Sequence, residues 1–147
     1  MPRCPKCNGT TLAGQPCQNR TCKFAPKCHL HSKVQVGRSS IAGRGLMAKK
    51  DIPKGEIVAD YKIGTTQMNR AEFLRKYPNG RATHVWSPSG NVYYDGSDLS
   101  KSVAGAANRG TGSTTNSRIN GGGKLVTKRK IKKGQEILVN YGPAFRL

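Results

Sequence analysis

The residues best suited to bind a metal lie within the first 31 positions of the 147-residue chain. All five cysteines and two of the three histidines fall there. Thiolate and imidazole are the usual ligands of structural zinc, which takes four of them in a tetrahedron. So short a segment cannot form a stable hydrophobic core without a bound metal to hold it together. We therefore expect one zinc ion, with candidate ligands Cys4, Cys7, Cys17, Cys22, Cys28 and His31.

The spacing of these residues leaves three ligand sets open, all of which contain Cys28 and His31. The other two ligands are Cys17 with Cys22, Cys4 with Cys7, or Cys7 with Cys17. We also expect a reducing compartment, in which cysteines bind metals more often than they form disulfides. No cysteine follows His31, which indicates a boundary between residues 1–33 and residues 34–147.

A second group of residues could bind an organic ligand and position an amine. Gly43 and Gly45 flank Arg44, and glycine lets the backbone approach a ligand closely. A tyrosine ring can form the wall of a narrow channel, and its hydroxyl can orient an amine. Residues 130–141 repeat the pattern of residues 51–61, and the two segments end in Tyr141 and Tyr61. The repeat indicates either two similar hairpins or two tyrosines that frame one site.

These motifs, in this order, resemble the SET domain of protein lysine methyltransferases. The resemblance runs from about Val34 to the end of the chain. It rests on residues 43–45, the turn at 52–56, the Tyr61–Gly64 segment, the Asn108 and Asn116 pair, and residues 134–142. It implies a mainly β fold of short curved sheets, with the C-terminal segment threaded as a pseudoknot. It also implies methyl transfer from S-adenosylmethionine to a protein lysine, with a histone tail as the default substrate.

The same resemblance implies a role for each matching residue. Tyr141 is the expected catalytic residue, together with Tyr61. The expected cofactor-binding residues are Gly43, Arg44, Gly45, Asn108, Arg109, Tyr141 and Phe145. The expected substrate channel is formed by Tyr61, His84, Trp86 and Val139. For Trp86 a core position is also expected, and for His84 an exposed strand position is an equal alternative.

Three features depart from the family pattern. Arg109 replaces the family histidine that helps to place the adenine, which puts cofactor affinity in question. Val139 replaces a larger aromatic residue of many relatives, which predicts room for di- or trimethylation. No cysteine cluster follows Tyr141, so the zinc site that often follows the domain is missing. The Cys7–His31 segment resembles the short Cys/His modules of large-DNA-virus proteins.

Short apolar runs separated by glycine predict the elements that must position these groups. Strands are expected at 46–48, 56–61, 85–86, 92–94, 124–129 and 136–141. Helix should be scarce. One helix is expected to start after Asn69, because Glu72 completes a capping box, and to present Ala71, Phe73, Leu74 and Tyr77 as its apolar face. The segment from Ser97 to Asn120 shows no clear period.

The net charge of the chain indicates which partners it can bind. There are 26 basic and 7 acidic residues, for a net charge of +19. Such a field attracts polyanions, so DNA or chromatin is an expected partner beside the protein substrate. No apolar run is long enough to span a membrane, and there is no signal peptide, so we expect an intracellular protein in the nucleus or at chromatin. A homodimer is compatible with the sequence. The alternative is a zinc-containing nucleic-acid-binding protein with a weak or inactive SET domain.

Overall fold

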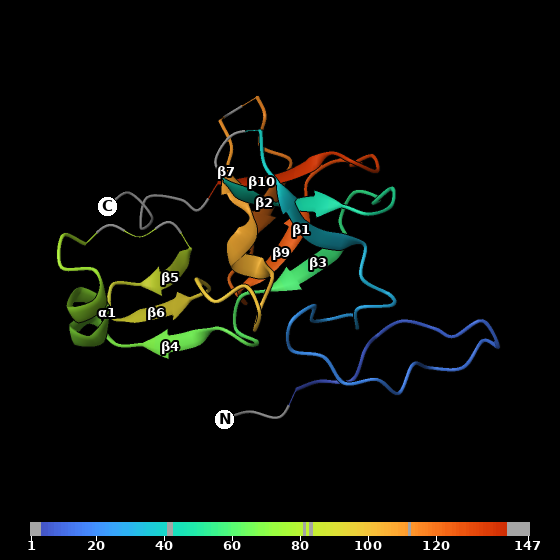
Figure 1. The fold of residues 1–147 in the computed structure, drawn as a ribbon, viewed down its shortest axis with the longest axis horizontal. Coiled ribbons are helices and arrows are strands. Elements are labelled where there is room, and N and C mark those ends of the chain that lie inside the picture. Colours follow the sequence, from blue (N-terminus) through green and yellow to red (C-terminus); the bar gives the residue numbers. More distant parts are fainter. Residues whose placement is uncertain (1–3, 41–42, 81, 83, 112, 141–147) are drawn as a thin grey trace.

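The computed structural model describes residues 4–40, 43–80, 82, 84–111 and 113–140, which form two β-sheets, one α-helix and one short 3-10 helix. The described chain is mainly β, as predicted. The larger sheet occupies the centre of the molecule, and the smaller sheet with its helix lies to one side (Figure 1). No described helix has the length and apolar character needed to cross a membrane.

The larger sheet is organised around its last strand. Its strand order is β1-β2-β10-β8-β9-β3, and β7 also pairs with β10. The strands are β1 (Val34–Arg38), β2 (Arg44–Ala48), β3 (Ile57–Asp60), β7 (Asn108–Arg109), β8 (Ser117–Ile119), β9 (Lys124–Thr127) and β10 (Glu136–Asn140). β10 runs antiparallel to β2 but parallel to β7 and β8. This central strand therefore joins segments that are distant in the sequence.

β10 can occupy this place because its middle residues are apolar on both faces. Ile137 and Val139 are completely buried, and Leu138 is 8% exposed. A strand covered on both sides needs such a continuous apolar run. The threading expected of the C-terminal segment would be completed beyond Asn140, outside the described residues.

The sequence repeat corresponds to two turns that face each other. Ile52 and Ile131 form an antiparallel bridge with backbone hydrogen bonds of 2.7 and 2.9 Å, and both side chains are completely buried. Gly55 and Gly134 hold equivalent turn positions with φ of +81° and +88°, a conformation that favours glycine. The structure thus contains two similar turns, but they are not hairpins, because among the described strands β2 does not pair with β3 and β9 does not pair with β10.

The smaller sheet has the order β4-β6-β5. Its strands are β4 (Thr66–Met68), β5 (Val85–Ser89) and β6 (Val92–Asp95), and β5 and β6, which contain two of the predicted strands, form an antiparallel hairpin. A separate small core lies between this sheet and the helix, where the rings of Phe73 and Tyr93 stack with their centroids 4.1 Å apart.

Helix α1 (Arg70–Lys76) begins as predicted. The Asn69 side chain accepts a hydrogen bond from the Glu72 backbone, and the Glu72 side chain accepts one from the Asn69 backbone. The predicted apolar face was wrong in part, because Phe73 is the only buried residue of the helix and Leu74 is 38% exposed. A helix of two turns against a three-stranded sheet has room to bury one large side chain.

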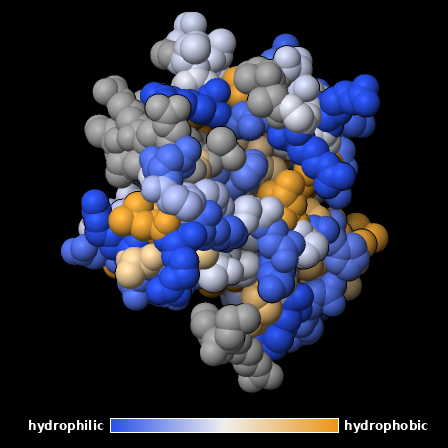
Figure 2. All heavy atoms as spheres, turned by 60° about the vertical axis from the view of Figure 1, so that its left-hand side comes forward, coloured by the Kyte–Doolittle hydropathy of each residue, from blue (hydrophilic) through white to orange (hydrophobic). Residues whose placement is uncertain are grey.

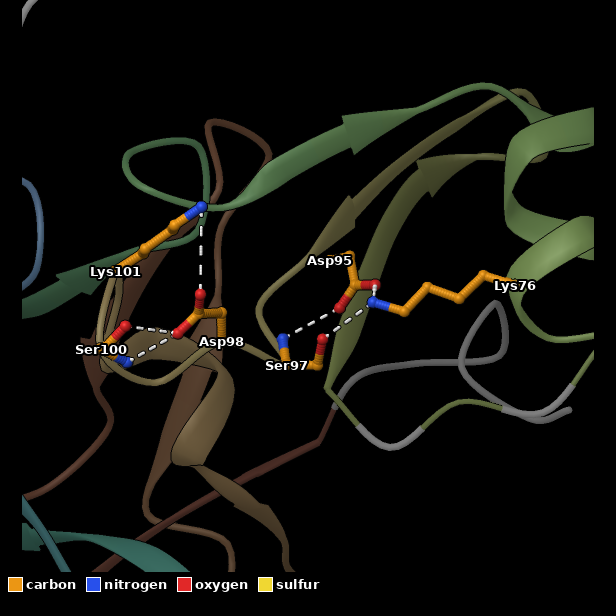
Figure 3. Close-up of polar contacts among 6 residues, drawn as sticks. All are labelled: Lys76, Asp95, Ser97, Asp98, Ser100 and Lys101. Atoms are coloured by element: carbon orange, nitrogen blue, oxygen red, sulfur yellow. Dashed lines mark hydrogen bonds and ion pairs between the residues drawn. The ribbon is translucent and has the colours of Figure 1, made fainter.

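Asp95 fixes the end of α1 to β6. Its buried carboxylate accepts hydrogen bonds from Lys76 Nζ at 2.6 Å and the Ser97 backbone at 2.9 Å (Figure 3). It also accepts one from the Tyr77 hydroxyl at 3.1 Å. Burial alone would raise the pKa of Asp95, but the hydrogen bonds from Lys76 and Ser97 outweigh it and hold this pKa below its ordinary value. The ion pair is therefore one of the stronger links in the smaller sheet.

The N-terminal segment (residues 4–33) has turns and isolated bridges in place of regular helices or strands. It contacts the rest of the chain through a hydrogen bond from the Val103 backbone to the Lys23 carbonyl at 2.9 Å, and Phe24 packs on the main core. Lys33 also pairs with Glu56 at 2.8 Å. The face that carries the smaller sheet is mostly hydrophilic, with apolar residues in small separate groups (Figure 2).

Candidate functional site

Hydrogen bonds join three of the sequence motifs at the start of β10. The Asn108 side-chain amide donates to the Arg44 carbonyl oxygen at 3.1 Å and to Glu136 Oε2 at 2.9 Å. The Ser39 hydroxyl lies 2.8 Å from both carboxylate oxygens of Glu136. We call Gly43, Arg44, Gly45, Asn108 and Glu136 the β10 corner. It is assembled by β2, β7 and β10.

The two glycines of the β10 corner are required for different reasons. Gly43 has φ of +48° with open space around its missing Cβ, so its backbone conformation favours glycine. A Cβ at Gly45 would lie 2.5 Å from Glu136 Oε2 and 3.1 Å from Ser39 Cβ. A side chain at Gly45 would therefore push the Glu136 carboxylate away from its contacts with Asn108 and Ser39. Glu136 was missing from the predicted site, although its position at the head of an apolar strand marks it as a polar group facing other elements.

Two cavities border the β10 corner. The larger, of about 540 Å³, is lined by Ser40, Asn116, Glu136 and Leu138 among others. The smaller, of about 340 Å³, is lined by residues of β1 and by Gly43 and Arg44. Asn116 fixes the wall between the larger cavity and β10, because its amide bonds the Glu136 carbonyl and the Leu138 backbone at 2.8 Å each. The corner thus offers backbone groups, an amide and a carboxylate beside hollow surfaces.

Arg109 and Val139 lie opposite each other in the parallel pairing of β7 and β10. Arg109 is exposed, so its side chain can reach a ligand at the surface. Val139 is completely buried in the main core. Tyr141 and Phe145 lie outside the described residues, and β10 leads directly to position 141.

Two of the four predicted channel residues, Tyr61 and Trp86, form an aromatic group with Tyr94. Tyr61 is completely buried, and its ring centroid lies 6.3 Å from that of Trp86. Trp86 is 6% exposed and stacks on Tyr94 at 5.4 Å, so the expected core position of Trp86 is confirmed. His84 is half-buried and its Nδ1 lies 2.5 Å from the Gly105 carbonyl oxygen. A carbonyl only accepts, so Nδ1 carries the proton.

Four residues of the N-terminal segment form a candidate metal centre. The ligand atoms of Cys7, Cys17, Cys28 and His31 all lie within 4.8 Å of one another, and the cysteines are buried. His31 Nδ1 is 3.4 Å from the sulfurs of both Cys7 and Cys28, and the sulfurs of Cys17 and Cys28 are 3.9 Å apart. Ligands on a zinc tetrahedron are separated by about 3.5–3.8 Å. The chemistry and the spacing of this group therefore fit zinc, and the group is the third predicted ligand set.

Polar groups around these sulfurs support the same assignment. The Gly9 backbone donates to Cys7 Sγ at 3.3 Å, and the Asn19 amide donates to Cys28 Sγ at 3.6 Å. Such donors stabilise thiolate charge and orient metal ligands. A Cβ at Gly9 would come within 2.6 Å of His31 Cγ, so the glycine leaves room for the imidazole.

Cys4 and Cys22 correct the sequence-based expectation. They were candidate zinc ligands in a reducing compartment, but the structure joins them in a disulfide outside the metal group. The antiparallel bridge between Lys6 and Arg20 brings their backbones together, with a Cα separation of 5.0 Å. The two ligand sets that use either cysteine are therefore excluded by the structure.

The fold and the β10 corner define a β protein whose final strand gathers a glycine-flanked turn, an asparagine and a carboxylate. A model of the SET-domain family matches residues 43–142, more than half of the chain, and the chain belongs to this family. Members of the family are generally protein lysine methyltransferases that use S-adenosylmethionine. No curated protein matches the chain. The family resemblance predicted from the sequence is thus confirmed.

Proposed function

We propose that the protein is an S-adenosylmethionine-dependent protein lysine N-methyltransferase. The observation that carries the proposal is the β10 corner, in which Asn108 joins Arg44 and Glu136 by hydrogen bonds within the matched region. From this corner β10 runs directly to Tyr141, the proposed catalytic tyrosine. One short strand therefore connects the proposed cofactor site to the proposed catalytic residue in the sequence.

S-adenosylmethionine, when bound, supplies a methyl group on a sulfonium. Gly43, Gly45 and Asn108 would hold it through backbone and amide groups, with Arg109 and Phe145 at its adenine end. The Glu136 carboxylate is held by Asn108 and Ser39, and its negative potential would favour a cationic sulfonium nearby without pairing with it directly. These donors and this charge fit the cofactor.

The remaining side chains act on the substrate lysine. Its amine must be neutral to react, and an apolar channel favours the neutral form. Tyr61, Trp86 and His84 would form that channel and exclude water, while the Tyr141 hydroxyl orients the amine. The small Val139 leaves room for di- or trimethylation. Mass spectrometry of exhaustively treated substrate tests this, and a product that stops at monomethyl-lysine contradicts it.

We further propose that zinc bound by Cys7, Cys17, Cys28 and His31 holds the N-terminal segment in shape. The buried cysteines and their backbone donors support this structural role. Metal analysis of the purified protein should find one zinc per chain. A protein that contains none, even after zinc is supplied, would contradict the site.

The proposed setting is intracellular, in the nucleus or at chromatin, with a histone as the default substrate. The net charge of +19 supports contact with DNA. The exposed Arg109, where relatives have histidine, favours the second function, a zinc-containing nucleic-acid-binding protein with an inactive SET domain.

Calorimetry with S-adenosylmethionine separates the two functions. Wild-type protein should bind the cofactor, and Asn108→Ala should bind it more weakly, while the exposed Asn91→Ala serves as a control of matched chemistry. Duplex DNA binding without measurable cofactor binding would favour the second function.

A further inference from the structure

The acidic side chains of this chain are all engaged in its own structure. Each of the seven accepts at least one hydrogen bond or ion pair from within the chain. Four pair with lysines, namely Glu56, Asp60, Asp95 and Asp98. The others accept hydrogen bonds: Asp51 from the Lys133 backbone, Glu72 in the helix cap and Glu136 in the β10 corner.

This arrangement is poorly suited to a strongly basic substrate. Recognition of arginine or lysine side chains relies on carboxylates that can pair with them. Here such pairing would compete with existing internal contacts of the carboxylates. The net charge of +19 would also repel a basic substrate. Like charges across an interface also slow association and weaken it.

A cavity of about 370 Å³ is suited to an acidic ligand, because its charged lining residues are basic. It lies between the N-terminal segment, which contributes the Cys4–Cys22 disulfide, and the loop at residues 62–67, with Tyr94 and Lys101 as further walls. Lys62 and Lys101 are the charged groups among its described lining residues, and both are exposed. Lys101 also pairs with Asp98, but this contact is long at 3.9 Å and both side chains are exposed, so a carboxylate entering the cavity would still meet positive charge.

This cavity lies beside the proposed lysine channel. Its loop follows Tyr61 directly, and the Thr65 hydroxyl donates to the Tyr61 carbonyl oxygen. Tyr94 stacks on Trp86, which in turn contacts Tyr61. The cavity also includes Thr66 and Gln67 of β4, which pairs only with β6 among the described strands. An extended peptide could lie along that free edge.

The backbone segments that carry the two lysines are packed against each other. Gly64 has φ of +79°, and a Cβ there would overlap the carbonyl oxygen of Lys101. The loop is thus closed tightly onto the segment that carries Lys101. The fold therefore fixes the backbone positions of Lys62 and Lys101, and their exposed side chains carry the positive charge at the rim of the cavity.

We propose that the target lysine is carried by a protein segment with acidic flanking residues, in place of the basic histone tail that the family resemblance makes the default substrate. These flanking residues would bind in this cavity against Lys62 and Lys101. The inference rests on the proposed methyltransferase function and names its substrate class. Two exposed ion pairs of this kind predict a preference of about tenfold over a basic segment.

The test uses two fluorescent peptides that share a central lysine and differ only in flanks of aspartate or arginine. Binding is measured by fluorescence anisotropy, and methyl transfer separately with labelled S-adenosylmethionine. The variant Lys62→Glu with Lys101→Glu changes the cavity. The control Lys50→Glu with Lys54→Glu makes the same charge change at exposed positions outside it.

The acidic peptide should bind wild type and the control about tenfold more tightly than the basic peptide. The cavity variant should lose most of this preference. Equal losses in both double variants, or equal displacement of the peptide from both by duplex DNA, would show general attraction of polyanions and overturn the inference. Preference for the basic peptide would overturn it too.

The two readouts separate this inference from the function on which it rests. Transfer to the basic peptide in preference to the acidic one overturns the inference and leaves the function standing. If the acidic peptide binds in the cavity but neither peptide is methylated, the proposed function fails instead.

Discussion

Gly64 provides a quantitative test of how the loop after Tyr61 is built. It has φ of +79°, and an added Cβ would overlap the Lys101 carbonyl oxygen and lie 3.1 Å from the carbonyl carbon. Gly55 has nearly the same φ of +81° but nothing within 4 Å of an added Cβ. The two positions therefore share the conformational penalty and differ in the backbone contact.

The magnitudes follow from these two terms. An alanine forced into the left-handed region costs about 1 kcal/mol, which is the full expected effect of Gly55→Ala. Overlap with fixed backbone adds roughly 2 kcal/mol more, giving about 3 kcal/mol for Gly64→Ala. In a domain of this size 1 kcal/mol lowers Tm by about 2–4 °C. We expect losses of about 3 °C for Gly55→Ala and about 9 °C for Gly64→Ala.

Thermal unfolding followed by circular dichroism measures both variants in the same buffer. Chemical denaturation gives an independent free energy of unfolding for each. Equal destabilisation of the two variants would refute the close packing of the loop on Lys101. It would also weaken the description of the cavity beside Tyr61, because that loop forms one of its walls.

Three further predictions concern separate parts of the chain. Asn108→Ala removes two hydrogen bonds, one of them to a carboxylate, and should destabilise the protein by about 2 kcal/mol, whereas Asn91→Ala should have little effect in the same unfolding assay. Asp95→Asn should lower Tm at neutral pH. The pKa of Asp95 in the folded protein lies below its ordinary value of 3.8, so the carboxylate stabilises the fold above pH 3.8. The difference in Tm between variant and wild type should shrink as pH falls further, and a difference in Tm that is unchanged at pH 2 would contradict this. Cys28→Ser should abolish zinc binding, measured by elemental analysis, while Cys22→Ser should retain it; equal zinc content in both would contradict the ligand set.

The sequence was most informative where a motif has a local physical cause. Asn69 and Glu72 predicted the helix start because both partners of a capping box lie three residues apart. The turn at Gly134 and the apolar run after it predicted β10. The ordered motifs around them were sufficient to identify the family, which the match to residues 43–142 confirms.

Long-range partners were beyond the reach of these patterns. β7 and β8 are only two and three residues long, and apart from Ile119 they are polar, so no periodicity marked them as partners of β10. The Asn108 and Glu136 hydrogen bond joins residues 28 positions apart and depends on that pairing. The cysteines raised the same difficulty, because their spacing allowed several ligand sets and only the fold separates the disulfide from the metal group.

The central claim is methyl transfer to a protein lysine, and labelled S-adenosylmethionine tests it most directly. Wild-type protein and Tyr141→Phe are incubated with a histone panel and with the acidic-flanked peptide. Labelled methyl-lysine should form with wild type and fall at least about tenfold with Tyr141→Phe, because the variant lacks the orienting hydroxyl. No labelling by wild type on any substrate would contradict the claim, and equal labelling by both proteins would contradict the role of Tyr141.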